Sequence, residues 1–340
     1  MRKVLFVGGT GTISSAIVRR MAVDDGWEVW LLNRGNRKDI PEGVHQIIAD
    51  IHNEDQVREA IADFSFDCVC EFIGFVKEDV ERDVRLFRDK TKQYIFTSSA
   101  SAYHKPAASY IVNEGTTLAN PYWEYSRNKI ECENYLMEQY RNNGFPVTIV
   151  RPSHTYDERS IPIAVHGNNG SWQVIKRMKE GKPVIIPGDG SSLWTLTFNT
   201  DFANGYVGLA GNPLAVGEAF QITGDETLTW NQIYETISDA FGVKLNAYHV
   251  ASDFLAKAGE KYGYDFRGGL TGDKAVSVVF DNSKLKKYVP SMKTEVPFRE
   301  GVHKAIEYIS GHPECQKDDP DFDSWCDKVV EEQEKALDEI

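Results

Sequence analysis

The fold is decided by the stretch Lys3-Val4-Leu5-Phe6-Val7-Gly8-Gly9-Thr10-Gly11-Thr12-Ile13-Ser14, near the start of a 340-residue chain. Its four consecutive apolar residues predict a buried strand, and the residues from Ser15 onward have the pattern of a helix. A glycine-rich turn between the two lets the backbone approach a ligand, and the N–H groups and dipole of the helix favour a phosphate. Gly8, Gly11 and Ser14 match the spacing Gly-x-x-Gly-x-x-Gly except at the third position. The pattern predicts a dinucleotide-binding turn, although such turns also close ordinary strand-to-helix loops.

Strands and helices alternate beyond this turn. Further strands are expected at 27–32, 44–49, 67–73, 93–99 and 146–152, and helices at 53–64, about 77–90 and 122–143. This alternation predicts βαβ units and therefore an α/β fold with a doubly wound parallel sheet, whose ligand lies beyond the carboxyl ends of the strands. The candidate cofactor-binding residues at those ends are Gly8, Gly11, Thr12, Ile13, Asn33, Arg34, Asp50, Ile73 and Gly74.

The texture of the sequence changes beyond Ser153, where Pro and Gly become frequent and short strands and helices mix. We expect residues 1–153 to form a Rossmann domain, with a return to it near 195–229. Residues 154–340 are expected to form mainly a smaller, mixed α/β substrate lobe and an acidic C-terminal helix. From residue 314 the chain has eleven acidic residues and three lysines. This pattern favours a solvated helix with Trp325, Val329 and Leu337 facing inward.

Composition excludes several classes of protein. Hydrophobic residues make up 41% of the chain, yet no apolar run approaches 18 residues, so we expect neither a membrane span nor a signal peptide. The net charge of −13 argues against a nucleic-acid-binding surface. The five cysteines are scattered, and Cys68 and Cys70 lie in a strand-like run as expected buried thiols, which fits a reducing cytoplasm. No cluster has the spacing of a metal site.

A candidate acid–base pair lies in the helical segment at 122–143. Tyr125 and Lys129 stand four residues apart and therefore share one helix face. An ammonium beside a phenol favours the phenolate, so we expect Lys129 to lower the pKa of Tyr125. Such a pair also arises by chance in many helices. Here it follows Ser99 at the end of a predicted strand, and the glycine-rich turn precedes both.

These features together resemble the extended short-chain dehydrogenase/reductases, also called the NAD-dependent epimerase/dehydratase family. The resemblance covers roughly residues 3–229. It is carried by Gly8-Gly9-Thr10-Gly11, Asp50, Thr97-Ser98-Ser99-Ala100-Ser101-Ala102-Tyr103, Glu114, Pro121, Tyr125-x-x-x-Lys129, Arg151-Pro152 and Asn199-Thr200-Asp201-Phe202-Ala203.

The resemblance implies roles for individual residues. Tyr125 would be the general acid or base, Lys129 would lower its pKa and bind the nicotinamide ribose, and Ser99 would hold the substrate oxygen. Asp50 would contact the adenine, and the glycines of the turn would line the pyrophosphate. A homodimer through the Tyr-Lys helix and the preceding helix is also implied.

The chain departs from the family pattern at two places that bear on the cofactor. Ser14 replaces the third glycine, as in the atypical branch of the family. The second predicted strand ends at Asn33-Arg34, with Arg37 and Lys38 nearby, where an acidic residue usually binds a ribose hydroxyl. Because arginine can bind a 2′-phosphate, we expect NADP(H) in preference to NAD(H). The alternative is that Arg34 is solvated and NAD(H) binds.

Substrate contacts are assigned to His154, Trp194 and Tyr103. By resemblance, nucleotide-sugar enzymes carry an asparagine and a diphosphate-binding arginine where this chain has His154 and Trp194. The loss of that arginine argues against a nucleotide-sugar substrate, and Trp194 can instead stack on a sugar. His154 can equally be a structural, hydrogen-bonded histidine.

Two functions follow from these observations. The first is an NAD(P)-dependent oxidoreductase or epimerase acting on a hydroxyl or ketone of a carbohydrate-like small molecule. The second is a non-catalytic NAD(P)-binding regulatory or RNA-associated protein of the same fold. The intact Ser99, Tyr125 and Lys129 favour the enzyme, and the acidic balance disfavours RNA.

Overall fold

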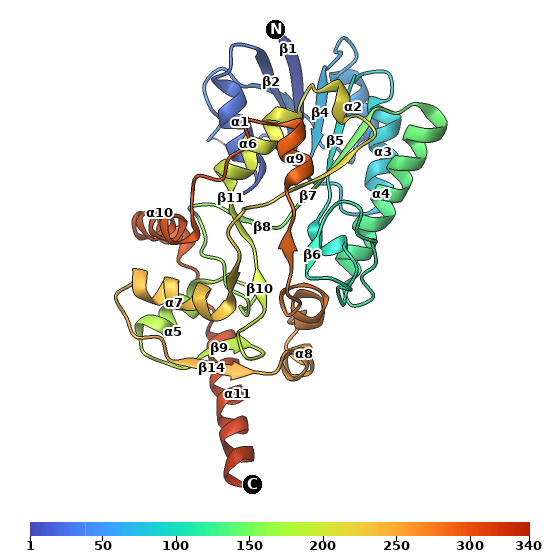
Figure 1. Ribbon diagram of the computed structural model, residues 1–340. Helices are drawn as coiled ribbons and strands as arrows, with labels where there is room; N and C mark the ends of the chain where they lie inside the picture. Colours follow the sequence, from blue (N-terminus) through green and yellow to red (C-terminus); the bar gives the residue numbers. More distant parts are fainter. Residues whose placement is uncertain (38) are drawn as a thin grey trace.

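A seven-stranded sheet, in which every pair of neighbours is parallel, forms the centre of the computed structural model (Figure 1). The structure describes residues 1–37 and 39–340, so Lys38 lies outside the described residues. In spatial order the strands are β12 (Ala219–Ile222), β7 (Val147–Pro152), β5 (Tyr94–Thr97), β4 (Cys68–Glu71), β1 (Arg2–Val7), β2 (Trp27–Asn33) and β3 (His45–Ile48). The predicted doubly wound sheet is therefore confirmed.

Helices cover both faces of this sheet because successive side chains of a strand point to opposite faces. Val4 and Phe6 of β1 pack in the core beneath one set of helices, and Leu5 and Val7 pack in the core beneath the other. The first face carries α1 (Ser14–Ala22), α6 (Asn199–Leu209) and α9 (Ser283–Tyr288). The second carries α2 (Glu54–Ala60), α3 (Lys77–Phe87) and α4 (Glu124–Asn143).

A second lobe, drawn below the sheet in Figure 1, is built around its own hydrophobic core. Its short strands pair as β8 (His154–Tyr156) with β11 (Leu196–Phe198), β9 (Val184–Pro187) with β14 (Ala247–Val250), β10 (Leu193–Trp194) with β13 (Leu228–Thr229), and β6 (Ile111–Val112) with β15 (Val279–Phe280). Its helices are α5 (Trp172–Lys179), α7 (Trp230–Ala240), α8 (Ser252–Glu260), the π-helical η3 (Arg267–Lys274), α10 (Phe298–Gly311) and α11 (Pro320–Asp338). Short 3₁₀ turns occur at η1 (Ala100–Ala102), η2 (Pro213–Ala215) and η4 (Pro313–Cys315).

The segment at 195–229 passes through both lobes. Its first strand, β11, pairs with β8 outside the central sheet, whereas α6 packs against α1. The strand that joins the central sheet is β12, which pairs with β7 at the edge and buries Phe220 and Ile222. The chain therefore returns to the sheet through β12. The sequence pattern did not predict a strand in this segment.

Two expectations about the interior have different outcomes. Cys68 and Cys70 are buried free thiols with their Sγ atoms 3.7 Å apart, as predicted. In α11, Trp325 and Val329 are buried, but Leu337 is 63% exposed, so its predicted inward position is wrong. The last turns of α11 extend beyond the body of the lobe (Figure 1). Within the described chain, no helix combines the length and apolar character needed to cross a membrane.

Candidate active site and cofactor groove

Three adjoining cavities lie at the carboxyl edge of the sheet. Two of them share Gly8, Thr10, Ile73 and Phe75 and so form one continuous groove. The third, of about 250 Å³, meets the groove at Tyr125 and is called the inner cavity below. The groove begins where β1 and β4 end side by side, which is the point where the strand order reverses and where ligands bind in sheets of this type.

Backbone geometry shapes the glycine turn that borders the groove. Gly8 has a φ of +82°, and a Cβ atom there would lie 2.5 Å from Cγ2 of Ile73. Ser14, in place of the third glycine, donates from Oγ to the Gly8 carbonyl (2.8 Å) and accepts from the Gly11 N–H (3.0 Å). Asn199 holds the same turn from the start of α6 by donating to the Thr12 carbonyl (3.1 Å). Ser14 therefore fastens the turn that the glycine spacing predicted.

At the far end of the groove, three predicted residues gather after β2 and β3. Asn33 accepts a hydrogen bond from the Gly35 N–H (2.8 Å), and Asp50 accepts one from the His52 N–H (3.1 Å). The loops that follow β2 and β3 are therefore each held by one of their own side chains. Arg34 is exposed and lines the groove, and among the described residues its guanidinium makes no hydrogen bond or ion pair. It is therefore free to bind an anionic group.

The residues of the groove fit a dinucleotide. The N-terminus of α1 borders the groove beside Gly11, and a helix N-terminus is suited to bind a phosphate. The buried hydroxyls of Thr97 and Ser98 border the groove and have no hydrogen-bond partner among the described residues, so a ligand can use them. The predicted residues that line the groove are Gly8, Gly11, Thr12, Ile13, Asn33, Arg34, Asp50, Ile73 and Lys129. Gly74 contacts the groove indirectly, because its carbonyl accepts a hydrogen bond from Lys129.

Tyr125 and Lys129 lie one turn apart near the start of α4. The Nζ of Lys129 is buried and donates to the carbonyls of Gly74 (2.7 Å) and Thr97 (2.8 Å). It also lies 4.7 Å from the ring centre of Phe96. Burial lowers the pKa of Lys129 to about 8, because the charged amine loses its hydration.

The pKa of Tyr125 does not shift in the direction that was expected from its neighbour Lys129. Burial raises the pKa of Tyr125, and hydrogen bonding with Ser99 only partly offsets this rise. Lys129 donates two of its three N–H groups to backbone carbonyls, and its Nζ lies 5.9 Å from the ring centre of Tyr125. The prediction of a lowered pKa is therefore wrong for this structure, in which the neutral phenol is favoured.

Ser99 belongs to a chain of hydroxyl groups beside Tyr125. Its Oγ lies 2.8 Å from Oγ of Ser101, which accepts from Ser126 (2.7 Å). Ser126 is the residue after Tyr125 on α4, so the chain connects the end of β5 to the helix that carries the phenol. Sequence reasoning named Ser99 but missed the two partners that orient it.

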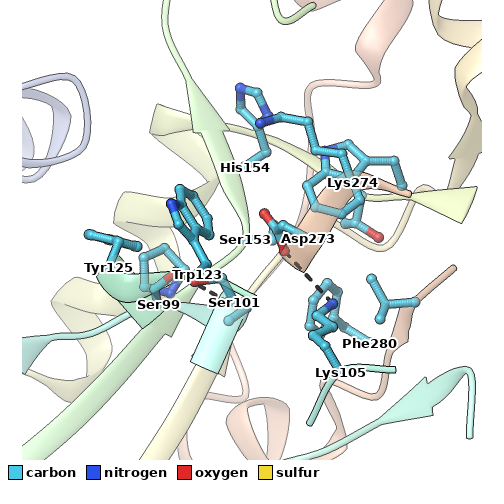
Figure 2. A pocket seen from close by; sticks show the side chains of 15 residues that line it. Ser99, Ser101, Lys105, Trp123, Tyr125, Ser153, His154, Asp273, Lys274 and Phe280 are labelled. Carbon is cyan, nitrogen blue, oxygen red and sulfur yellow. Dashed lines mark hydrogen bonds and ion pairs between the residues drawn. The ribbon is translucent and has the colours of Figure 1, made fainter. Parts of the chain in front are cut away.

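The inner cavity gathers side chains from segments far apart in the sequence (Figure 2). His154 and Trp194 line it as expected, with their rings 6.5 Å apart and edge to face. Burial and the nearby charge of Lys274 lower the pKa of His154 to about 3. Sequence reasoning missed four further lining residues, Lys105, Trp123, Asp273 and Lys274, because no motif marks them.

Tyr103 occupies a different place from the one assigned to it. Its side chain is 1% exposed, and its hydroxyl donates to Oε1 of Gln221 (3.0 Å) and accepts from Arg151 (3.3 Å). It does not line the inner cavity. Tyr103 thus links β12 to β7 outside the inner cavity, in a different place from the substrate contact expected of it.

The described ranges 1–37 and 39–340 contain no cluster of side chains suited to bind a metal ion. No group of three or more His, Cys, Asp or Glu side chains there is placed to hold a metal ion.

Comparison with known proteins agrees with this geometry. The model of the NAD dependent epimerase/dehydratase family matches residues 4–223. Among curated relatives, the chloroplast stem-loop binding protein of 41 kDa b from Arabidopsis thaliana is 26% identical over 71% of this chain, and the match spans 64% of that protein's length. The 2'-dehydrokanamycin reductase of Streptomyces kanamyceticus is 23% identical, over 85% of this chain and 79% of the reductase.

Solved structures share the fold. The dTDP-glucose 4,6-dehydratase of Bacillus anthracis in complex with NAD has a TM-score of 0.72 at 18% identity, covering 92% of this chain and 98% of the dehydratase. The UDP-glucuronic acid 4-epimerase of Bacillus cereus, in complex with UDP-glucuronic acid and NAD, has a TM-score of 0.71 at 19% identity, covering 91% of this chain and 99% of the epimerase.

Proposed function

Because this chain belongs to the NAD dependent epimerase/dehydratase family, we propose that it is an NAD(P)-dependent oxidoreductase or epimerase. Its substrate is a sugar or sugar-like molecule that reacts at a hydroxyl or keto group, and Ser99, Tyr125 and Lys129 carry the chemistry. One observation supports this function above all: Tyr125 borders both the groove and the inner cavity. A phenol in that position reaches a substrate in the cavity and a cofactor in the groove at once.

In this proposal Tyr125 transfers a proton, and Ser99 and Lys129 position the reacting groups. A bound nicotinamide supplies hydride transfer to or from the substrate carbon. In reduction, the neutral phenol of Tyr125 gives its proton to the carbonyl oxygen, and in oxidation the phenolate takes the hydroxyl proton. The Ser99 hydroxyl orients that oxygen, supported by Ser101. Lys129, with a pKa of about 8, holds the walls of the groove together at Gly74 and Thr97 and has a third N–H for a ligand.

We further propose that the cofactor is NADP(H) in preference to NAD(H). The guanidinium of Arg34 supports this preference, because it is exposed just after β2, has no hydrogen bond or ion pair among the described residues and can bind a 2′-phosphate. Solved structures of similar fold name NAD in their complexes, so NAD(H) is the competing cofactor. Mass spectrometry of any dinucleotide released from the denatured, purified protein distinguishes the two. Firmly retained NAD⁺ would reverse the preference and favour an epimerase.

The variant Tyr125→Phe tests the enzyme. We expect turnover to fall by roughly 100- to 10,000-fold, the usual contribution of a positioned proton donor, while the dissociation constant for NADPH stays within about twofold. Turnover is followed by NAD(P)H absorbance against a panel of keto sugars, and dinucleotide binding by fluorescence titration. Tyr110→Phe, at an exposed tyrosine, is the matched control. Equal turnover in wild type and Tyr125→Phe would contradict the proposed site.

A nucleic-acid function has one observation in its favour, the name of the stem-loop binding relative. The net charge of −13 opposes it, because backbone phosphates require clustered lysine and arginine. An electrophoretic mobility shift assay with an RNA stem-loop separates the two functions. Salt-sensitive RNA binding without any NAD(P)H-dependent turnover would replace the enzymatic proposal.

A further inference from the structure

The wall of the inner cavity opposite Tyr125 is built from hydrogen-bond donors. We propose that Lys274, His154 and Trp194 form an oxyanion site, so that the substrate is a small polyol bearing a carboxylate or phosphate. The inference rests on the proposed function, because it takes the inner cavity as the substrate site. Figure 2 shows Tyr125 and Ser99 on one side of this cavity and His154 and Lys274 on another.

Lys274 supplies the positive charge of the site. Within the described residues its Nζ makes no hydrogen bond and no ion pair, although its side chain lines the cavity. The neighbouring carboxylate of Asp273 lies 3.7 Å from Nζ of Lys105, which is itself 2% exposed. Burial lowers the pKa of Lys274, and the carboxylate of Asp273 offsets only part of this lowering. Two lysines therefore lie beside one carboxylate, and an anionic ligand in the cavity would stabilise their charged forms.

Trp194 supplies a second, neutral donor. It is 5% exposed, and its Nε1 has no partner among the described residues although it is buried. A buried N–H without a partner is costly, so a ligand oxygen in the cavity would satisfy it. The ring is held by stacking on Trp230 at 5.7 Å, and Trp230 donates to the Lys274 carbonyl (2.9 Å). One tryptophan therefore positions both donors.

His154 completes the set as a neutral imidazole. Burial and the charge of Lys274 hold its pKa far below 6.5, so it carries one N–H and no charge at neutral pH. The three side chains come from β8, β10 and the end of η3. A wall with a lysine amine, an imidazole and an indole N–H that has no partner among the described residues suits a group that only accepts hydrogen bonds, such as a carboxylate or phosphate.

The cavity also limits the size of the substrate. Its volume of about 250 Å³ lies below the ~300–1,000 Å³ of pockets that hold drug-sized ligands. Gly268 of η3 lets this helix pack directly on Trp123, because a Cβ there would overlap the indole. Trp123 in turn lies 5.0 Å from the ring of Tyr125, so the wall is fixed close to the reacting group. These dimensions favour a single sugar acid or sugar phosphate over a nucleotide-linked sugar.

Isothermal titration calorimetry in the presence of saturating NADP⁺ tests the site. The probes are D-glucuronate, glucose 6-phosphate, neutral glucose and UDP-glucose. We expect at least one of the two small anions to bind about tenfold or more tightly than glucose, and Lys274→Met to remove that advantage. Lys274→Arg should retain most of it, which separates loss of charge from misfolding. Lys287→Met, at an exposed lysine without a hydrogen bond or ion pair among the described residues, controls for net charge.

The outcomes separate this inference from the function on which it rests. Preference for glucuronate identifies a carboxylate and preference for glucose 6-phosphate a phosphate; both support the site. Equal binding of glucose and the two anions, or an unchanged preference in Lys274→Met, overturns it. Tightest binding of UDP-glucose, unaffected by Lys274→Met, also overturns it. NADP⁺ affinity is measured separately without sugar: normal dinucleotide binding with no anion preference refutes only the oxyanion site, whereas absent dinucleotide binding refutes the enzyme.

Discussion

The groove and the inner cavity meet at Tyr125, yet they are built in different ways. The groove is formed by strand ends and the turns directly after them, and its key contacts involve backbone atoms, such as the Gly8 carbonyl held by Ser14. The inner cavity is formed by side chains that reach in from β8, β10 and η3. Backbone shape repeats wherever the same turn occurs, whereas a constellation of side chains is particular to its substrate. We therefore infer the class of cofactor from the groove and the class of substrate from the cavity.

The two regions also differ in how they treat charge. Arg34, at the end of the groove, is exposed, and its charge is solvated. His154, on the cavity wall, has a pKa near 3 because burial and Lys274 oppose its protonation. Changes of backbone shape should therefore act on the groove, changes of exposed charge should act at its Arg34 end, and changes of pH should act mainly on the cavity.

The largest expected effect on cofactor binding is that of Gly8→Ala. A Cβ at this position meets Ile73 and is strained by a φ of +82°, so we expect NADPH to bind at least about tenfold more weakly and the free energy of unfolding to fall by about 1–3 kcal/mol. Fluorescence titration and urea unfolding measure the two quantities.

Gly43→Ala is the matched control for that change. Gly43 has a φ of +80°, but a Cβ there has nothing within 4 Å. The variant should lose about 1–2 kcal/mol of stability from backbone strain and keep its NADPH affinity. Equal losses of NADPH affinity in both variants would show that the close approach of Gly8 to Ile73 is not what shapes the groove.

Arg34→Glu should have a smaller effect, confined to one cofactor. Reversing the charge at the end of β2 should weaken NADPH binding by about tenfold and leave NADH within about twofold, because only NADPH carries the 2′-phosphate. Parallel fluorescence titrations with both dinucleotides measure the difference, and NADH serves as the internal control. Equal losses for both would contradict the 2′-phosphate assignment.

The smallest effect concerns stability in acid. The pKa of His154 is about 3 in the folded chain and about 6.5 when unfolded, so between these pH values the unfolded state binds more protons. Wild type should therefore lose stability as the pH falls through this window, with His154 contributing at most about 1.4 kcal/mol per pH unit. His154→Gln removes that contribution. Urea unfolding from pH 7.5 to 4.5 checks it, and parallel curves for the two proteins would contradict the shift.

The sequence predicted the local elements of the first lobe well. The strands from β1 to β5 and β7 lie where apolar residues and their flanking turns indicated. The strands β4, β5 and β7 are buried on both faces of the parallel sheet, whereas β3 at its edge buries only Ile47. The edge strand β12 was not foreseen, since its four residues have no flanking motif and become a strand only by pairing with β7. Leu337 was misassigned because helical spacing does not reveal where the neighbouring lobe ends.

The candidate site divides in the same way. The residues of the groove, and the pair Tyr125 and Lys129, could be named from spacing, but the raised pKa of Tyr125 could not, because it depends on burial and on where Lys129 finds its hydrogen-bond acceptors. No sequence motif marks Asp273 or Lys274 as residues of the site.

By itself, the sequence determined the strands and helices that build the sheet, the glycine turn and the spacing of Tyr125 and Lys129, because each of these depends on neighbours a few residues away. Only the tertiary structure decided that Lys274, Trp194 and His154 share one cavity and that Tyr103 stands behind it. The physical reason is range. Strand, turn and helix preferences act over one or two turns of chain, whereas burial, unpaired donors and uncompensated charge arise when distant segments pack together and exclude water.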